Sequence, residues 1–263
     1  MDKNAQVQAI ISPQTSPHGQ AELFSGIAER GNIPILSSST TAPASTSSRS
    51  RFLVGTAPNI SSQAAPIAAI LKAFAWRAAV LLHEDSPYGV GILSALVHAF
   101  MWSRALTDSV AVASDATDSR LDAALLFSRA VAAGMMSEGY VWIATAGVGN
   151  AVDSLANHGD IDDMQGVVSL LPHVLVTEQV KSFYRRFKVK FRQESPDDDS
   201  ERGTPAWMLR LYDYDTVWAA AAAAEVSFGA AQRTAFLDAL LATKFDGLAG
   251  RFRLVDGQLQ VSA

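Results

Sequence analysis

The chain has 263 residues, of which 49% are hydrophobic and 18% are charged, and its formal net charge is −5. This length and composition are those of a globular protein with one or two domains and a sizeable buried core. The acidic balance argues against general binding to nucleic acid or anionic lipid, and the absence of cysteine excludes disulfides and cysteine-ligated zinc.

The first half of the chain alternates extended and helical patterns. Short apolar runs bounded by turn residues predict strands, whereas apolar residues spaced three or four apart predict helices. The predicted strands lie at 7–12, 33–39, 77–83 and 109–114, and the predicted helices lie at 19–31, 61–74, 88–102 and 119–134. Residues 52–58 lead into the helix at 61–74 and are interpreted as a connection between two lobes.

The second half continues the alternation and then ends in a hairpin. The predicted elements are strands 140–145 and 166–172, an amphipathic helix marked by apolar residues from 180 to 191, helices 207–229 and 236–245, and a hairpin over 250–261. Asp256-Gly257 supplies the hairpin turn. Strands that alternate with helices predict parallel sheets flanked by helices, here in two lobes.

No metal, cofactor or catalytic motif is visible. The five histidines form no HExxH or other close ligand pair, and GxSxG, P-loop and GxGxxG patterns are absent. The basic residues between Lys181 and Arg192 predict a solvated helix face, which gives no reason to expect a nucleic-acid partner. We therefore expect no enzyme, no metal and no cofactor.

Membrane and export signals are also missing from the pattern. No run of about 18 apolar residues predicts a membrane segment. The start of the chain lacks a basic segment followed by an apolar run, so no signal peptide is expected. Asn59-Ile60-Ser61 is a glycosylation sequon whose use the sequence leaves open.

Hydroxyl side chains follow the first two predicted strands. Thr15 and Ser16 follow one strand, and serines and threonines from Ser37 to Thr41 follow the next. Hydroxyls together with helix N-terminal amides can hold a carboxylate, because the amide groups and the helix dipole favour an anion. The alternative is that these residues serve only in turns and caps.

Seven segments, in order along the chain, resemble one family. They are "VQAIISPQTS", "IPILSSSTTAP", "SSQAAPIAAILKAFAWR", "HEDSPYGVGI", "GMMSEGYVWI", "MQGVVSLLP" and "GLAGRFRLVDGQLQ". Together they resemble the extracellular amino-terminal domain of plant glutamate-receptor-like channels. The resemblance implies an α/β fold with two lobes, of the type I periplasmic-binding-protein kind, with parallel sheets flanked by helices.

The resemblance also implies lobe boundaries and missing parts. Lobe 1 would comprise residues 1–57 and 173–250, lobe 2 residues 58–172, and a returning hairpin residues 251–263. The family carries another strand and helix before residue 7, and one more helix and strand between residues 119 and 125. We therefore expect an incomplete form of the fold.

Four ligand-binding residues follow from the resemblance. The family's carboxylate-binding positions fall on Ser16, Ser39 and Thr41, in the hydroxyl clusters described above. Its aromatic contact, in a Y-E-D-x-x-Y-G motif, falls on Tyr88. These positions predict a small-ligand site of the amino-acid type.

Two acidic positions of the family pattern are lost. The family's W-I-x-T-D-G has Ala146 in place of the aspartate, and its N-D-S-S-Q stretch has Ile60 in place of the acidic residue. An ammonium group buried without its partner is costly. Binding of ordinary amino acids should therefore be weakened.

Two functions from different classes remain open. The first is a truncated extracellular ligand-binding domain of a glutamate-receptor-like ion channel, on the outer side of the plasma membrane, which senses a small ligand by lobe closure. The second is an interaction module that binds no ligand and pairs with full-length receptor subunits. Both predict homo- or hetero-oligomers with receptor subunits.

Overall fold

The computed structural model describes residues 7–12, 20–38, 50–85, 87–112, 119–149, 162–194, 206–229 and 234–260. The chain divides into two compact units, Met1–Ala111 with Leu209–Ala263, and Val112–Met208. These breaks differ from the lobe boundaries implied after residues 57 and 172, which remain a prediction from the resemblance.

The first unit contains a six-stranded sheet in the order β1-β2-β3-β10-β9-β8. Neighbouring pairs from β1 to β10 are parallel, and the last two pairs are antiparallel. The strands are β1 (Ile10–Ser12), β2 (Ile35–Ser37), β3 (Leu53–Pro58), β8 (Lys244–Asp246), β9 (Arg251–Val255) and β10 (Gln258–Leu259). Among the described strands, β1 is an edge strand and pairs with β2 alone.

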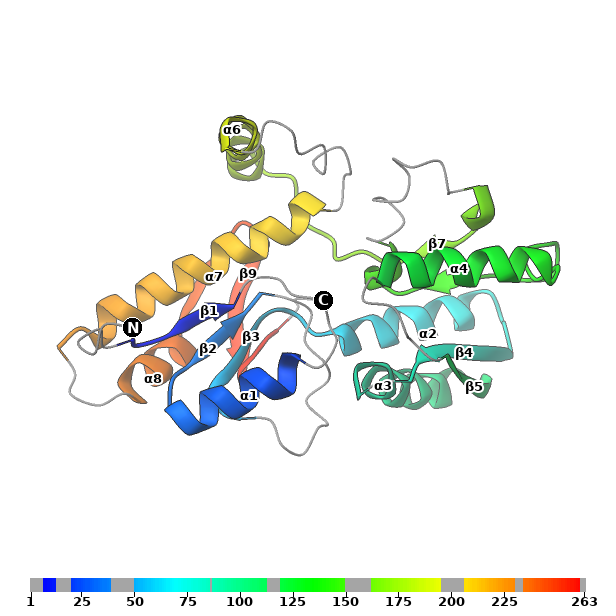
Figure 1. The fold of residues 1–263 in the computed structure, drawn as a ribbon, viewed down its shortest axis with the longest axis horizontal. Helices are drawn as coiled ribbons and strands as arrows, with labels where there is room; N and C mark the ends of the chain where they lie inside the picture. Colours follow the sequence, from blue (N-terminus) through cyan, green and yellow to red (C-terminus); the bar gives the residue numbers. More distant parts are fainter. Residues whose placement is uncertain are drawn as a thin grey trace. The chain divides into compact units, whose positions relative to one another are not determined.

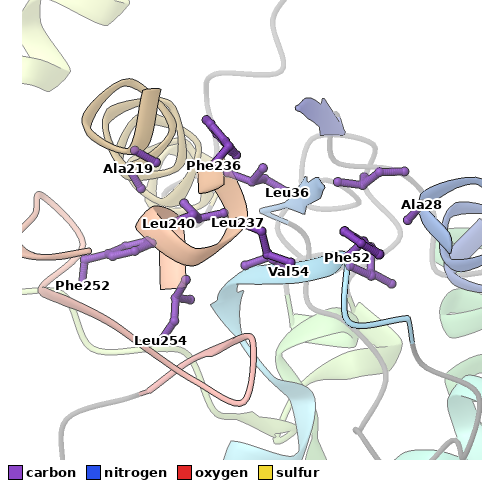
Figure 2. Close-up of a cluster of buried hydrophobic side chains, with 13 residues drawn as sticks. Ala28, Leu36, Phe52, Val54, Ala219, Phe236, Leu237, Leu240, Phe252 and Leu254 are labelled. Atoms are coloured by element: carbon purple, nitrogen blue, oxygen red, sulfur yellow. The ribbon is translucent and has the colours of Figure 1, made fainter. Parts of the chain in front are cut away.

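Helices cover both faces of the parallel strands. The helices are α1 (Gln20–Gly31), α7 (Ala206–Ser227) and α8 (Thr234–Ala242), and Figure 1 shows α1 and α7 on opposite sides of the sheet. All residues of β2 and β3 are buried, as expected for parallel strands between two helical layers. Figure 2 shows the core cluster that these elements share, which includes Leu240 of α8, Val54 of β3, Ala28 of α1 and Phe52.

The predicted hairpin is present, and it extends further back than expected. Asp256 and Gly257 form the turn, both with positive φ (49° and 70°). The helix expected over 236–245 ends at Ala242, because the chain from Lys244 pairs with β9 instead. That pairing stacks Phe245 on Phe252, with ring centroids 4.8 Å apart.

A second part of the first unit is a small α/β layer. It comprises η1 (Ile60–Gln63), α2 (Ala64–Ala73), β4 (Ala78–Glu84), α3 (Pro87–Ser103) and β5 (Leu106–Val112), and α2 packs against α3. In the described chain β4 and β5 form a sheet of two strands (Figure 1). Exposure alternates along β4, whereas β5 is exposed at all but one of its residues. The open apolar side chains are Val80, Leu82, Leu106, Val110 and Val112.

The second unit has shorter strands than expected. It contains α4 (Ser119–Ala132), β6 (Ile143–Ala144), η3 (Asp162–Met164), β7 (Val168–Ser169) and α6 (Glu178–Glu194). β6 and β7 pair in parallel over two residues each. Their expected ranges, 140–145 and 166–172, are therefore too long. A small core forms here around Phe127 and Met164, and the ring of Trp142 packs edge-on against Phe127 at 5.3 Å.

Helix α6 is amphipathic, as predicted. Val180 is buried, and the rings of Phe183, Phe187 and Phe191 stack along the helix at centroid distances of 5.9 and 5.7 Å. Most of the basic side chains of α6 are exposed, in agreement with a solvated face. Within the part of the chain that the structure describes, no helix is both long and apolar enough to cross a membrane.

Candidate functional site

The carboxyl ends of the three parallel strands β1, β2 and β3 bring hydroxyl groups to one edge of the sheet. The register pairs Ser12 with Ser37, and Ser37 with Gly55. Ser12, Ser37, Ser38 and Thr56 are all buried. Ligands of α/β sheets bind beyond the carboxyl ends of the strands, so this edge is the candidate site.

Thr56 joins this edge to helix α7. Its side chain is fully buried, its hydroxyl donates to the Ser37 carbonyl at 3.0 Å, and it lies 2.6 Å from the Thr216 hydroxyl. Thr216 in turn donates to the Tyr212 carbonyl one turn earlier, at 2.6 Å. Buried hydroxyls with partners fix geometry, because leaving one unpaired is costly. Thr56 therefore positions the end of β3 against α7.

A carboxylate of α7 also reaches the strand ends. Ser38, which directly follows β2 and is 2% exposed, donates through its hydroxyl to Oδ1 of Asp213. The other oxygen of Asp213 lies 3.4 Å from Nη1 of Arg210 on the same helix. Asp213 retains partial exposure, so a negative charge lies at the surface beside the hydroxyl edge.

A second carboxylate of α7 is buried and serves the fold. Asp215 accepts hydrogen bonds from the backbone N–H groups of Leu248 and Ala249, both at 2.8 Å. Burial raises the pKa of Asp215, and the two N–H groups oppose that shift. Burial of Tyr212 itself, together with the charge of Asp215, raises the pKa of Tyr212 to about 12. Asp215 thus ties α7 to the loop before β9.

The predicted ligand-binding residues are not tested by this geometry. Ser16, Ser39 and Thr41 lie outside the described residues, and so does the side chain of Tyr88, whose backbone lies at the start of α3. Ser39 directly follows the buried Ser38 in the chain. The assignment of all four to a ligand site stays a prediction.

Sequence reasoning missed Thr56 and Asp213. Residues 52–58 were interpreted as a connection between lobes, so neither the strand that holds Thr56 nor its contact with α7 was predicted. Asp213 and Asp215 stand two residues apart in a helix otherwise rich in alanine, so they lie on different sides of it. That pairing of polar residues in an apolar helix was the available signal.

Of the two positions where the family pattern has an acidic residue, the structure describes the side chain at one, Ala146. Ala146 is 3% exposed and follows β6 in the second unit, at the start of a helical turn over 146–149. Ile60 begins η1, where Asn59 caps the turn by accepting from the Ser61 N–H at 2.9 Å. The side chain of Ile60 lies outside the described residues.

Solved structures place the fold among type I periplasmic binding proteins. A leucine binding protein from Thermotoga maritima matches with a TM-score of 0.75 at 18% identity, over 97% of this chain and 74% of that chain. A solute binding protein from R. palustris, solved with 4-hydroxybenzoate, matches with a TM-score of 0.73 at 14% identity, over 96% and 72%. The predicted fold class is thereby confirmed.

The sequence comparisons give the family. The family model "Receptor family ligand binding region" matches residues 1–120 and 109–262, and the chain belongs to this family. Glutamate receptor 2.7 of Arabidopsis thaliana is 30% identical over 99% of this chain, and glutamate receptor 2.8 is 30% identical over 98%. The chain spans about a third of the length of these relatives, 31% in each case. The resemblance to glutamate-receptor-like proteins is confirmed, and these relatives and neighbours are receptors and solute-binding proteins, which are not enzymes.

The alignments also show that this chain is shorter internally. The alignment with glutamate receptor 2.7 runs over 311 positions, although this chain has 263 residues. Dozens of positions of the relative therefore have no counterpart here. The two matches to the family model overlap at residues 109–120, from the second half of β5 to the start of α4. This range is close to where the resemblance predicts a missing helix and strand.

Proposed function

We propose that this chain is the extracellular ligand-binding domain of a glutamate-receptor-like channel and that it senses a small ligand of the amino-acid type. The observation that supports this most is the buried hydroxyl edge of β1, β2 and β3, in a chain of the ligand-binding family. Ser16, Ser39 and Thr41 would add hydroxyls to the same edge. Family membership supports a location on the outer side of the plasma membrane.

The proposed mechanism is closure of two lobes about the ligand. The strand-end hydroxyls would hold one end of the ligand, and Tyr88 would contact it from the other lobe. The ligand would shift the equilibrium from the open to the closed form. The free energy of this shift equals the difference between the ligand's binding free energies for the two forms.

Binding of ordinary amino acids is weakened in this proposal. Ala146 and Ile60 replace acidic residues of the family pattern, so the ammonium group loses its partners there. A hydrogen bond to a charged group contributes about 1.5–3 kcal/mol, which corresponds to at least a tenfold loss of affinity for each contact removed.

The test is calorimetric titration of the purified chain, together with melting curves. Glycine, L-glutamate, L-leucine and 4-hydroxybenzoate serve as probes, because a ligand of the native state raises the melting midpoint. We expect at least one probe to bind, with glycine and L-glutamate weaker than micromolar. Replacing Ser16 and Thr41 together by alanine should abolish the shift, whereas an unchanged shift would place the site elsewhere.

A second candidate, the interaction module, rests on a different observation. Val80, at 64% exposure, and Leu106, at 79%, belong to an open apolar face, and β1 is an edge strand of the described sheet. Open edges and apolar faces favour pairing with another chain. Sedimentation at several concentrations tests this idea, because a monomer at every concentration, with or without a receptor subunit, would contradict it.

A further inference from the structure

We infer that the outward face of helix α7 is an interface between two copies of this chain, in which the two α7 helices pack antiparallel across a two-fold axis. The inference does not depend on ligand binding. It concerns a different surface from the β4–β5 face and the β1 edge, on which the second candidate function rests.

Helix α7 carries apolar side chains on two sides. Its inner side packs into the main core through Ala219 and Ala223, which are fully buried, and Figure 1 shows the helix lying along one face of the six-stranded sheet. Its outer side carries an apolar stripe, whose members are three or four residues apart and therefore share one face of the helix. The outer stripe consists of Tyr214, Val217, Trp218 and Ala221.

The outer stripe is well exposed. Val217 is 54% exposed, Trp218 is 56% exposed and Tyr214 is 39% exposed. The outward face of a helix that packs on a sheet is normally polar, and a helix that is apolar all round is normally buried. Tryptophan and tyrosine are also enriched in the central contacts of protein interfaces. The stripe therefore has the composition of a surface that another chain covers.

Charges of opposite sign flank the outer stripe. Arg210 lies one turn before it and Glu225 one turn after it, and both residues are exposed. In an antiparallel helix pair with a two-fold axis between Val217 and Trp218, position 210 of one helix lies level with position 225 of the other. The axis repeats this contact, so two Arg210–Glu225 pairs would form between the copies.

The intrachain contact of Arg210 leaves it able to make this pair. Its Nη1 lies 3.4 Å from Oδ2 of Asp213, and the arginine side chain is 48% exposed. An exposed pair of this kind contributes little to stability. A guanidinium group also has five N–H donors, so Arg210 can contact Asp213 and a glutamate of the second copy together.

The same axis matches large side chains with small ones. Tyr214 of one copy lies level with Ala221 of the second copy, and Val217 lies level with Trp218. An alanine leaves room for the aromatic ring that faces it, as in knobs-into-holes packing. A parallel pair would instead set Arg210 against Arg210 and Trp218 against Trp218. Charge and size therefore both favour the antiparallel arrangement.

The contact predicts a weak dimer. Positions 210 to 225 span about 24 Å of helix, and a helix with its side chains is about 10 Å wide. A single helix pair of this length is smaller than a standard interface of about 1,600 Å². We expect a dissociation constant on the order of 10 µM, so that the monomer and the dimer exchange within an accessible concentration range.

Sedimentation equilibrium of the purified chain, from about 1 to 200 µM, tests the inference. Trp218→Glu places a charge beside the two-fold axis and should weaken self-association at least tenfold. The matched control is Val226→Glu, because Val226 is 79% exposed on the same helix but lies off the outer stripe. This control should leave self-association unchanged.

A charge exchange tests the antiparallel arrangement. Arg210→Glu alone and Glu225→Arg alone each set like charges against each other, so each should weaken the dimer at least threefold. The two changes together restore opposite charges at both contacts and should return the dissociation constant to within about threefold of the wild type. A double variant as weak as the single variants would overturn the antiparallel arrangement.

Other outcomes would overturn the inference as a whole. A monomer at every concentration would do so, and so would an unchanged dimer in Trp218→Glu. A dimer that Leu106→Glu abolishes and Trp218→Glu does not would place the contact on the β4–β5 face instead.

A crosslinking experiment decides the case in which Trp218→Glu fails to fold in a circular-dichroism melt. The chain has no cysteine, so a single introduced thiol can form a disulfide only with a second copy. Val217→Cys lies beside the two-fold axis and should form a covalent dimer on mild oxidation, whereas Val226→Cys should remain a monomer. Failure of Val217→Cys to crosslink, or equal crosslinking of both variants, would overturn the inference.

Discussion

Replacing Asp215 by asparagine should loosen the contact between α7 and the loop before β9. Asparagine keeps the shape of the side chain but offers one acceptor oxygen where aspartate offers two. One of the two N–H groups, that of Leu248 or that of Ala249, would then face an NH₂ group instead of a carboxylate oxygen. The other would keep a neutral hydrogen bond in place of a charged one.

The expected loss follows from these two contacts. A hydrogen bond to a charged group contributes about 1.5–3 kcal/mol, and a neutral one about 0.5–1.5 kcal/mol. The variant loses one of these contacts and weakens the other. Part of this loss is offset, because neutral asparagine avoids the cost of burying a charge, which is what raises the pKa of Asp215. We expect a net loss of about 2 kcal/mol in the free energy of unfolding, which lowers the melting midpoint by roughly 4–8 °C in a domain of this size.

The loss should also depend on pH. Burial raises the folded pKa of Asp215 above its ordinary value of 3.8, so the folded chain retains a proton that the unfolded chain releases. The stability of the wild type relative to Asp215→Asn therefore falls as pH rises from about 4 through the raised pKa. The advantage of the wild type is largest at acidic pH.

Urea denaturation at several pH values measures both effects. Hydrogen exchange adds a local readout, because the amides of Leu248 and Ala249 should exchange about tenfold faster in the variant. Asp238→Asn on the exposed face of α8 serves as the control and should change stability by less than about 0.5 kcal/mol. Unchanged stability of Asp215→Asn, or a relative stability that rises with pH, would refute the reasoning.

Three further predictions concern packing. Leu240→Ala should lower the free energy of unfolding, measured by urea denaturation, by about 2–5 kcal/mol, because Leu240 is fully buried in the main core. A loss below about 1 kcal/mol would contradict this packing. Gly55→Ala should destabilise the β3–β10 pairing in the same measurement, since an added Cβ would lie 2.6 Å from the Gln258 amide nitrogen. Adding Gln258→Ala should recover much of the lost stability, and no recovery would argue against that contact. Ala146→Asp should lower the melting midpoint without ligand, because it buries a carboxylate, and L-leucinamide should raise that midpoint more than it raises that of the wild type if the position faces a ligand.

Hydrophobic patterning was a good guide to the first unit. The Asp-Gly turn after β9 was predicted correctly, because a tight hairpin is a local signal. β3 was not predicted as a strand: residues 52–58 were interpreted as a connection between lobes, whereas Leu53–Pro58 form a fully buried strand. The pattern was weaker near Lys244, where a helical period continues into residues that instead pair with β9. Tertiary pairing overrode local propensity there.

The strand-end contacts could not be read from spacing. Ser38 and Asp213 are far apart in the chain, and nothing in either segment points to the other. The sequence did place hydroxyls from Ser37 onward at the end of the second strand, and Ser37 and Ser38 are there in the structure. Their part in ligand binding stays a prediction. The carboxylate on α7 needed the fold, because only the packing of α7 on the sheet brings Asp213 to the end of β2.

The exposed apolar residues of β4 and β5 lie near the junction of the two family matches. In a doubly wound layout each face of a parallel sheet needs a helical cover, and alternate residues of β4, such as Val80 and Leu82, remain exposed. The alignment loses dozens of positions, and the two family matches meet at residues 109–120, at the end of β5. The six-stranded sheet and its helices, in contrast, keep a buried core around Leu240 and Val54. The contacts of Thr56, Ser38 and Asp215 lie outside that layer, in the six-stranded sheet, the helix α7 and the loop before β9.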